Sequence, residues 1–424
     1  MLLLGPMLKR YKDVSDLVFY PVGGLPLVSA LKGEAPSTMS RDTIARVEAV
    51  IVDLPLKRQQ RFAAVGAVST AVVLVRIATA GGADGVGECC TPSGPWWSGE
   101  SVESIKLMID DHITPHIIGE EVHNLRGIFR KVDRQLFGNW FAKAGVEMAL
   151  LDIQGKLAGV PVCDLLGGQR RSSMPCSWPL ATGDSGAEIE EAERWIDAGK
   201  FNAFKLKMGF LDPRDDVERA CAVARALGGR ASVRADPNES WDATICKWAL
   251  PRMEDAGVLL IEQPLVRWDL AGSARLAART GCTIMLDESV STTQDMLRIA
   301  ELRAADVISI KVMKHGGLTN SRRVADLALA TGLSLYMGTF LECSIGTAAG
   351  MQLAATFDHL PFGGELSGAQ LVAEDIAVSC ARYENFELQL EEGPGLAVEV
   401  DEQAVRALRR DRDYSVHPVR VVAS

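Results

Sequence analysis

Short apolar segments recur about every 25 residues in the second half of this chain, and this repeat constrains the fold more than any other feature. Strands that alternate with helical segments predict a parallel sheet covered by helices, because parallel neighbours need a right-handed crossover connection. Six or more such units within about 200 residues favour a closed barrel. An open, doubly wound sheet is the alternative, although no GxGxxG motif follows any of the strands. The predicted strands are Ala203–Met208, Ser232–Asp236, Val258–Glu262, Thr283–Asp287, Val307–Lys311 and Ser334–Gly338.

The ends of the predicted helices support this repeat. Asp212 followed by Pro213 is a typical helix start, because the aspartate can cap the first turn and proline fits the first helical position. Gly228 and Gly332 stand where helices are expected to end. Pro251 interrupts one of the helical segments, and we expect it to end or kink that helix.

The first half of the chain follows a different pattern. Residues 1–44 have loop composition without a regular period, and we interpret them as an N-terminal extension. Val47–Val52 and Thr70–Ile77 are rich in β-branched residues and predict strands, and the turn sequence Ala83–Gly85 predicts a hairpin. Phe141–Leu157 has helical spacing. Strands followed by helices predict an α+β module of about 120 residues.

The composition argues against several classes of protein. Acidic residues outnumber basic ones by 55 to 45, whereas a nucleic-acid-binding protein normally presents a basic surface. The longest nearly apolar stretch, Ala63–Val75, is shorter than the about 20 residues that span a bilayer. Nine cysteines without a CxxC pair and six histidines without an HExxH motif argue against a zinc site or a disulfide scaffold. We therefore expect a cytoplasmic protein whose partners are neither nucleic acids nor membranes.

Five consecutive predicted strands carry ionisable residues at or near their carboxyl ends: Lys205 with Lys207, then Asp236, Glu262, Asp287 and Lys311. In a barrel these ends meet at one mouth, where active sites form. Each carboxylate alone could instead cap the helix that follows it. Three carboxylates together would repel one another unless a cation lay among them. Ligands that are all oxygen favour Mg²⁺ or Mn²⁺ over zinc, so the pattern predicts a metal site.

The lysines flank that predicted site. Lys205 and Lys207 are two residues apart on one strand and therefore point to the same side. Lys311 lies four strands further on and should approach from the opposite side of the barrel. A lysine beside another ammonium group and a divalent cation should have a lowered pKa, which would make it usable as a base. Lys205 alone could equally form a structural ion pair.

Five further residues are weaker candidates. Glu342 and Glu365 follow the seventh and the presumed eighth strand, where each could act as an acid or electrophile, or cap a helix. Asn238 and Glu288 stand just beyond two of the carboxylates and could support the metal site. Trp97, which follows another tryptophan, could cover a pocket or belong to the core. We take Asn238, Glu342 and Trp97 as candidate substrate contacts.

These residues stand in motifs that resemble the enolase superfamily, in its muconate-lactonizing (muconate cycloisomerase) subgroup. The resemblance implies a modified TIM barrel, (β/α)7β, at residues 171–370. It also implies an α+β capping domain at 45–170, to which a C-terminal segment, 371–424, returns. The motifs are Phe204–Gly209 (FKLKMG), Arg234–Asn238 (RADPN), Ile261–Pro264 (IEQP), Leu286–Ser289 (LDES) and Ile310–Gly317 (IKVMKHGG).

The resemblance also implies roles for the site residues. Three of them, Asp236, Glu262 and Asp287, would be ligands of Mg²⁺ or Mn²⁺. Lys207 would be an acid/base supported by Lys205, Lys311 would be the lysine on the opposite side, and Glu365 would be a proton donor. The implied reaction is reversible closure of muconate, or of a chloro- or methylmuconate, to a lactone in aromatic hydrocarbon catabolism. The implied assembly is a homo-oligomer, with an octamer as one candidate.

Other functions of the same superfamily stay open. N-acylamino-acid racemase and o-succinylbenzoate synthase use similar lysines. A dipeptide epimerase would carry an Asp-x-Asp motif after the eighth strand, where this chain has Gly364–Gly368 (GELSG). Gln60 stands where the subgroup has a histidine in its substrate loop, which leaves the substrate open. An inactive barrel that serves as a ligand-binding scaffold is the non-enzyme alternative.

Overall fold

The computed structural model describes residues 42–63, 65–379 and 381–410. These residues belong to one compact unit that begins at Asp42. The predicted N-terminal extension lies outside the described residues except for its last three positions. None of the described helices is long and apolar enough to cross a membrane.

The first sheet is antiparallel, and its order is β1 (Ile44–Phe62), β2 (Val65–Thr79) and β3 (Asp84–Cys90). The predicted strands of the first half lie inside β1 and β2, and the predicted hairpin joins β2 to β3. β2 is the central strand, and its residues 72–75 are completely buried because both faces of the sheet are covered there. β1 continues well past the predicted strand, to Phe62, with a register shift between Pro55 and Gln60.

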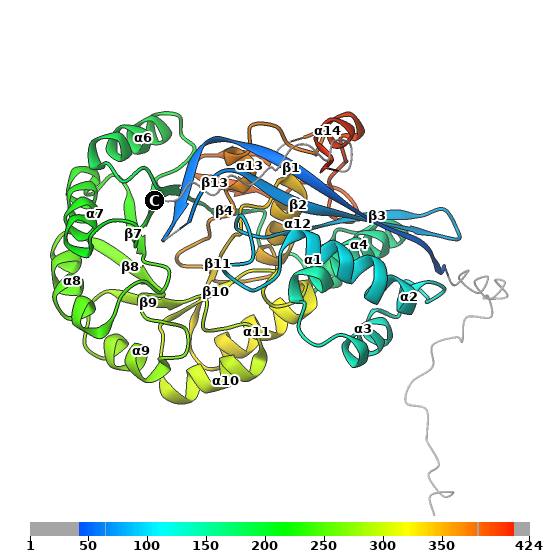
Figure 1. Cartoon of the computed structure of the whole chain (residues 1–424), viewed down its shortest axis with the longest axis horizontal. Coiled ribbons are helices and arrows are strands. Elements are labelled where there is room, and N and C mark those ends of the chain that lie inside the picture. Colours follow the sequence, from blue (N-terminus) through cyan, green and yellow to red (C-terminus); the bar gives the residue numbers. More distant parts are fainter. Residues whose placement is uncertain (1–41, 64, 380, 411–424) are drawn as a thin grey trace, which may run out of the picture. The chain divides into compact units, whose positions relative to one another are not determined.

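One face of this sheet packs against α4 (Trp140–Ala158), which contains the predicted helix (Figure 1). Two glycines of β3 allow the close approach, because a Cβ atom at Gly87 would lie 2.0 Å from the carbonyl oxygen of Gly145 in α4. The other helices of this half are α1 (Val102–Leu107), the π-helix η2 (Met108–Ile113), α2 (Thr114–Ile117), α3 (Leu125–Gln135) and α5 (Val162–Leu165).

The second sheet is the predicted parallel one, and its seven strands are paired in chain order. Residues 363–365 close it into a barrel, because Gly364 forms bridges both to Cys176 beside the first strand and to Met337 in the last. This confirms the predicted (β/α)7β barrel, whose helices surround the strands in Figure 1. The strands are β5 (Ser177–Leu180), β6 (Ala203–Lys207), β7 (Ser232–Asp236), β8 (Val258–Glu262), β9 (Thr283–Leu286), β10 (Val307–Ile310) and β11 (Ser334–Met337).

Helices connect these strands, and most begin where a polar side chain caps the first turn. Asp212 caps α7 as predicted, and Gly228 ends it. Pro251 does not end the helix, since α8 runs through this residue to Asp255, and the predicted kink stays a prediction. Pro251 is exposed, so the carbonyl group that loses its helical partner can lie on the solvent side. The helices are α6 (Ser185–Asp197), α7 (Pro213–Leu227), α8 (Ala243–Asp255), α9 (Leu270–Ala277), α10 (Thr293–Leu302), α11 (Leu318–Ala330) and α12 (Ser344–Ala354).

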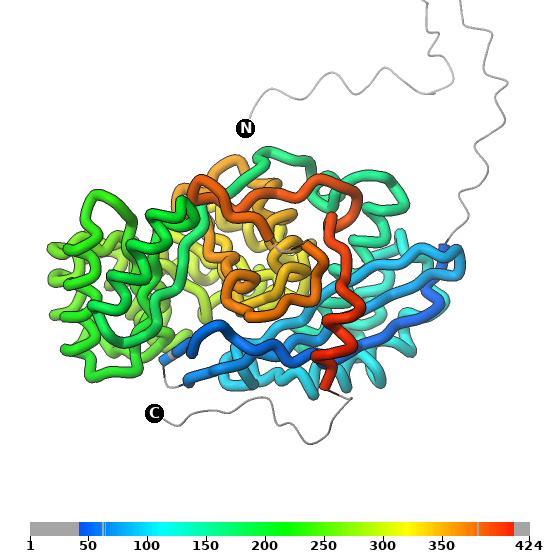
Figure 2. Tube along the Cα trace, turned by 90° about the horizontal axis from the view of Figure 1, so that it is seen from above, coloured from blue at the N-terminus to red at the C-terminus, as the bar shows by residue number. Residues whose placement is uncertain are grey.

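The chain after the barrel runs back to the first sheet. Leu56 in β1 forms a bridge with Val372, and Val52 forms one with Arg409. The last described helix lies beside β1, as the red and blue segments of Figure 2 show. The elements of this segment are α13 (Gly368–Leu371), β12 (Tyr383–Glu384), β13 (Glu387–Gln389) and α14 (Glu402–Leu408); β13 also pairs with β4 (Ser173–Pro175).

A buried carboxyl group links α4 to the barrel and gives a testable pH dependence of stability. Glu147 in α4 accepts a hydrogen bond from the backbone N–H of Thr319 in α11 at 3.1 Å. Burial raises the pKa of Glu147 from 4.5 to about 7. Because the folded state holds this proton more tightly than the unfolded chain, the stabilising contribution is complete below about pH 4.5 and is lost as the pH rises through about 7.

We expect Glu147→Gln to remove this pH dependence, because glutamine does not titrate and its oxygen can still accept from Thr319. Between pH 5 and 8.5, the free energy of unfolding of the wild type should fall by about 2.5 kcal/mol relative to that of the variant. Urea unfolding of both proteins at both pH values measures the difference, in which the other titrating groups cancel. The same pH dependence in both proteins would contradict the expectation.

Candidate active site

Three carboxylates and three lysines meet at the carboxyl ends of the barrel strands. The carboxylates stand where the strands end: Asp236 ends β7, Glu262 ends β8 and Asp287 directly follows β9. All three carboxylates are at most 1% exposed, although they carry charge. Such burial is costly for an unpaired ion, so each carboxylate needs a positively charged partner.

Lysine ammonium groups provide these partners. Lys207 Nζ lies 2.6 Å from Asp236 Oδ2, and Lys311 Nζ lies 2.6 Å from Asp287 Oδ2. Lys205 Nζ contacts Glu262 Oε2 at 2.6 Å and Asp236 Oδ2 at 3.5 Å. One ammonium group thus reaches two of the carboxylates, which places them next to each other.

The lysines approach this cluster from opposite sides, as the sequence predicts. Lys205 and Lys207 both lie on β6, whereas Lys311 follows β10, four strands further along the closed sheet. Glu365, from the segment that closes the barrel, forms an ion pair with Lys205. The carboxylates therefore carry an ammonium group on the β6 side and another on the β10 side.

The donor set suits a divalent cation, although the described side chains do not form a ready-made site for one. Within these residues no three His, Cys, Asp or Glu side chains form a metal-binding group, because lysines stand between the carboxylates. Yet Glu262 Oε1 is buried without any hydrogen-bond partner. Burial, with the nearby charge of Asp236, raises the pKa of Glu262 to about 7. Members of the enolase superfamily use a divalent metal ion, and these carboxylates fit that requirement.

The carboxylates of the cluster raise the pKa of two of the lysines, whereas the predicted lowering depends on a bound divalent cation and stays a prediction. Burial alone would lower the pKa of Lys205, but its three carboxylate neighbours raise it well above the usual value. The pKa of Lys311 is also raised, mainly by Asp287, which outweighs burial and the repulsion from Lys205.

Two polar residues support the cluster where the sequence places them. The backbone N–H of Asn238 donates to Asp236 Oδ1 at 3.0 Å, and its side-chain Nδ2 donates to Glu288 Oε1 at 3.1 Å. Burial and the charge of Asp287 raise the pKa of Glu288 to about 8. Asn238 Oδ1 and Glu288 Oε2 are buried without a partner, so this side of the cluster has unused acceptors.

Aromatic rings lie against the lysine on the β10 side. Lys311 Nζ is 4.4 Å from the ring centre of Phe340 and 5.5 Å from that of Trp97. The two rings pack edge to face at 4.6 Å, and Trp97 is 5% exposed. Arg267 donates to the backbone oxygen of Trp97 at 3.1 Å and fixes this loop to the barrel. Trp97 therefore lies beside the cluster.

Glu342 is held within its own loop. Its Oε2 accepts hydrogen bonds from Thr339 Oγ1 and, at 2.9 Å, from the backbone N–H of Phe340. These contacts hold the carboxylate within the loop, but they do not cap α12, whose N-cap residue is Cys343. The same loop is tied to the first sheet, because Glu88 in β3 accepts from the backbone N–H groups of Cys343 and Gly346 at 2.9 and 2.7 Å.

Sequence reasoning missed two charged residues in the barrel. Lys314 is 1% exposed and contacts Asp287. Its signal was present, since it lies three residues after Lys311 in a turn that ends with two glycines. Arg234 lies on β7 two residues before Asp236 and faces the same side. Its guanidinium group stacks on Tyr336 at 5.2 Å, and its Nε and Nη1 have no hydrogen-bond partner.

Gln60 lies at the far end of β1, and its side chain is completely buried. Its Oε1 accepts a hydrogen bond from Arg58 at 3.0 Å, whereas its Nε2 has no partner. Arg58 in turn pairs with Glu191 at 2.9 Å and donates to the backbone oxygen of Pro179 in β5. The end of the first sheet is thus bonded to the first barrel strand.

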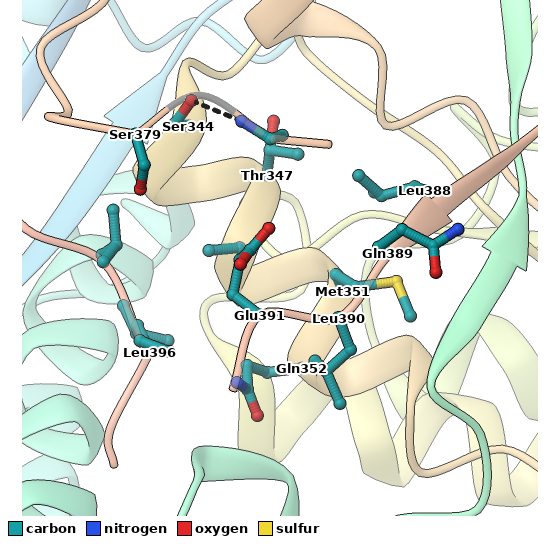
Figure 3. A pocket seen from close by; sticks show the side chains of 14 residues that line it. Ser344, Thr347, Met351, Gln352, Ser379, Leu388, Gln389, Leu390, Glu391 and Leu396 are labelled. Atoms are coloured by element: carbon teal, nitrogen blue, oxygen red, sulfur yellow. Dashed lines mark hydrogen bonds between the residues drawn. The ribbon is translucent and has the colours of Figure 1, made fainter. Parts of the chain in front are cut away.

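A separate small pocket, with a cavity volume of about 20 Å³, lies between α12 and the C-terminal segment (Figure 3). Thr347, Met351 and Gln352 of α12 line one side, and Leu388–Glu391 lie on the other. The described lining contains no lysine, arginine or histidine. The cluster at the barrel mouth is therefore the better candidate for binding a carboxylate.

Comparison with known protein families assigns both halves of the chain. Residues 46–167 match the N-terminal domain model of mandelate racemase / muconate lactonizing enzyme. Residues 187–404 match the enolase C-terminal domain-like model.

Individual relatives cover most of the chain. It is 48% identical to a chloromuconate cycloisomerase of Cupriavidus pinatubonensis. The 361 aligned residues cover 85% of this chain and 97% of the relative. It is 38% identical to muconate cycloisomerase 1-1 of Acinetobacter lwoffii, over 88% of this chain and 98% of the relative. Among solved structures, the muconate lactonizing enzyme of Pseudomonas fluorescens in complex with muconolactone has a TM-score of 0.86 at 38% identity, covering 87% of this chain and all of that one. The 2-chloromuconate cycloisomerase of Rhodococcus opacus 1CP has a TM-score of 0.85 at the same identity and coverage. The chain therefore belongs to the enolase superfamily, in its muconate-lactonizing subgroup.

Proposed function

We propose that this protein is a cycloisomerase that closes muconate, or a chloro- or methylmuconate, to a lactone. The observation that carries the proposal is the placement of Lys207 and Lys311 on opposite sides of three buried carboxylates. This arrangement can hold a carboxylate substrate between two proton donors. The muconate and chloromuconate cycloisomerases among its relatives support this choice of reaction.

In this proposal Asp236, Glu262 and Asp287 hold the divalent cation, and their oxygen donors favour Mg²⁺ or Mn²⁺. When bound, the ion stabilises the negative charge that develops on one substrate carboxylate during ring closure. Asn238 and Glu288 keep Asp236 oriented through the two hydrogen bonds described above.

The lysines move the proton. One carboxylate oxygen of the substrate adds to the conjugated diene, and the carbon next to the other carboxylate then needs a proton. Lys207 or Lys311 delivers it, depending on the face on which the ring closes. Lys205 stays paired with Glu262 and Glu365, so it holds the position of these carboxylates and Glu365 is the candidate for returning a proton to the lysines. The dicarboxylate substrate becomes a lactone with one carboxylate, so each closure takes up one proton, which the lysine gives to carbon and regains from water.

The surroundings of the cluster favour this chemistry. Trp97 and Phe340 exclude water from the Lys311 side, which strengthens the electrostatic interactions inside. We also propose that residues 45–170 with 371–424 act as a capping domain over the barrel at 171–370. A cytoplasmic homo-oligomer, for which an octamer is one candidate, is the proposed working form.

The assay follows from the substrate. Purified protein with Mg²⁺ or Mn²⁺ should abolish the ultraviolet absorbance of cis,cis-muconate or a chloromuconate, because ring closure destroys the conjugated diene. EDTA should stop the reaction, and added metal should restore it. Glu193→Gln, which removes only a surface ion pair with Arg230, should not affect it. No loss of absorbance with any muconate, together with racemisation of an N-acyl amino acid, would reject the proposal in favour of the racemase alternative.

A further inference from the structure

We propose that Lys314 is a positioning residue that holds Asp287 in place while Lys311 is free to leave it. This inference rests on the proposed function, in which Asp287 is a metal ligand and Lys311 moves a proton. It assigns different tasks to two lysines that stand three residues apart and contact the same aspartate.

The two lysines hold Asp287 in different ways. Lys314 Nζ lies 2.7 Å from Asp287 Oδ1 and 2.7 Å from the backbone oxygen of the same residue. Lys311, among the described contacts, reaches only Oδ2. A contact with a backbone oxygen does not depend on the carboxylate, so Lys314 stays bound to Asp287 whatever happens at Oδ2.

A tight turn sends Lys314 back toward Asp287. The backbone N–H of Gly317 donates to the oxygen of Val312 at 3.0 Å, and that of Gly316 donates to Met313 at 3.1 Å. Both glycines have positive φ angles, and a Cβ atom at Gly317 would lie 2.0 Å from Glu147 Oε2 in α4. The turn is thus fixed by packing, which leaves the Lys314 side chain little freedom.

The surroundings of the two ammonium groups also favour different tasks for Lys311 and Lys314. Lys311 faces the aromatic rings of Phe340 and Trp97 at the cluster. Lys314 has no recorded aromatic contact among the described residues, and its two contacts with Asp287 use two of its three N–H donors. A second buried ammonium group beside Asp287 adds nothing to proton transfer. Lys314 instead fixes the carboxylate, because it contacts both the side chain and the backbone oxygen of Asp287. Residues that orient metal ligands in this way typically contribute a factor of about 10–100 to metal affinity.

The affinity for a metal ion distinguishes a positioning role of Lys314 from a purely electrostatic effect of its charge. Removing either ammonium group takes a positive charge away from the cluster, so electrostatics alone predicts that Lys311→Met and Lys314→Met both bind Mn²⁺ more tightly than the wild type. If Lys314 positions Asp287, the two variants should differ in sign. Lys311→Met should bind Mn²⁺ as tightly as the wild type or more tightly, and Lys314→Met should bind it about 10–100-fold more weakly.

The measurement is the dissociation constant for Mn²⁺ alone, by calorimetry or electron paramagnetic resonance, on the full chain after chelator treatment. Circular dichroism checks the fold. Lys314→Gln keeps a side-chain N–H for the backbone oxygen of Asp287 and should give an intermediate affinity; if Lys314→Met does not fold, this variant decides by the same criterion. An affinity of the folded Lys314 variants equal to or tighter than that of the wild type would overturn the inference. A wild type that does not bind Mn²⁺ would instead contradict the proposed function.

Discussion

Lys207→Ala is expected to lower kcat by about 10²–10⁴-fold while leaving the protein folded. The lysine is buried against Asp236 at the barrel mouth, where the substrate is proposed to bind. Transfer of a proton by a positioned side chain typically contributes a rate factor of this size. The fold should survive, because Asp236 keeps contacts with Lys205 and with the backbone N–H of Asn238.

Rates with cis,cis-muconate, together with thermal unfolding of both proteins, measure this effect. Lys247→Ala is the matched control, because Lys247 is an exposed lysine on α8. Its rate and unfolding temperature should equal those of the wild type. A Lys207→Ala protein with wild-type kcat would remove Lys207 from the mechanism.

Glu262→Gln is expected to lower kcat/KM by at least about a thousandfold and to weaken Mn²⁺ binding. This carboxylate is central in the cluster, and its Oε1 has no partner among the described residues. An amide at this position keeps the shape but removes one of the three negative charges that would hold the cation. The stabilisation that a metal ion gives to developing charge amounts to several kcal/mol, which corresponds to about a thousandfold in rate.

Two measurements separate the effect on metal binding from damage to the fold. Mn²⁺ titration should show a weaker dissociation constant, and high Mn²⁺ should restore only part of the activity. Glu193→Gln makes the same chemical change on the surface and should alter neither quantity. If Glu262→Gln bound Mn²⁺ as tightly as the wild type, Glu262 would not be a ligand.

The barrel and the position of its charged cluster were predictable because both depend on local patterns. A buried parallel strand needs a continuous apolar run, so the residue that ends the run marks the barrel mouth, and Asp236 and Glu262 end their strands as predicted. Pairing between these side chains then follows from the convergence of the strands. Their roles as metal ligands and as acids or bases stay predictions.

Other elements carry weak or misleading local signals. β5 contains Pro179, which normally argues against a strand inside a sheet. The strand tolerates this proline because residues 363–365, which close the barrel, bond to the backbone N–H of Ser177, two residues before the proline. β1 extends through Lys57 and Arg61, whose charges hide the strand. The contact of Lys314 with Asp287 depends on how the chain reverses after β10, which the sequence does not specify.

The closing segment also limits how this protein can vary. The seam between β5 and β11 is joined through Gly364, where a methyl group would lie 2.7 Å from the backbone oxygen of Met337. The next residue is Glu365, the counter-ion of Lys205. Any side chain at 364 would push the seam apart and carry that counter-ion away from its lysine. Closure of the barrel and the ion pair between Lys205 and Glu365 thus depend on the same glycine.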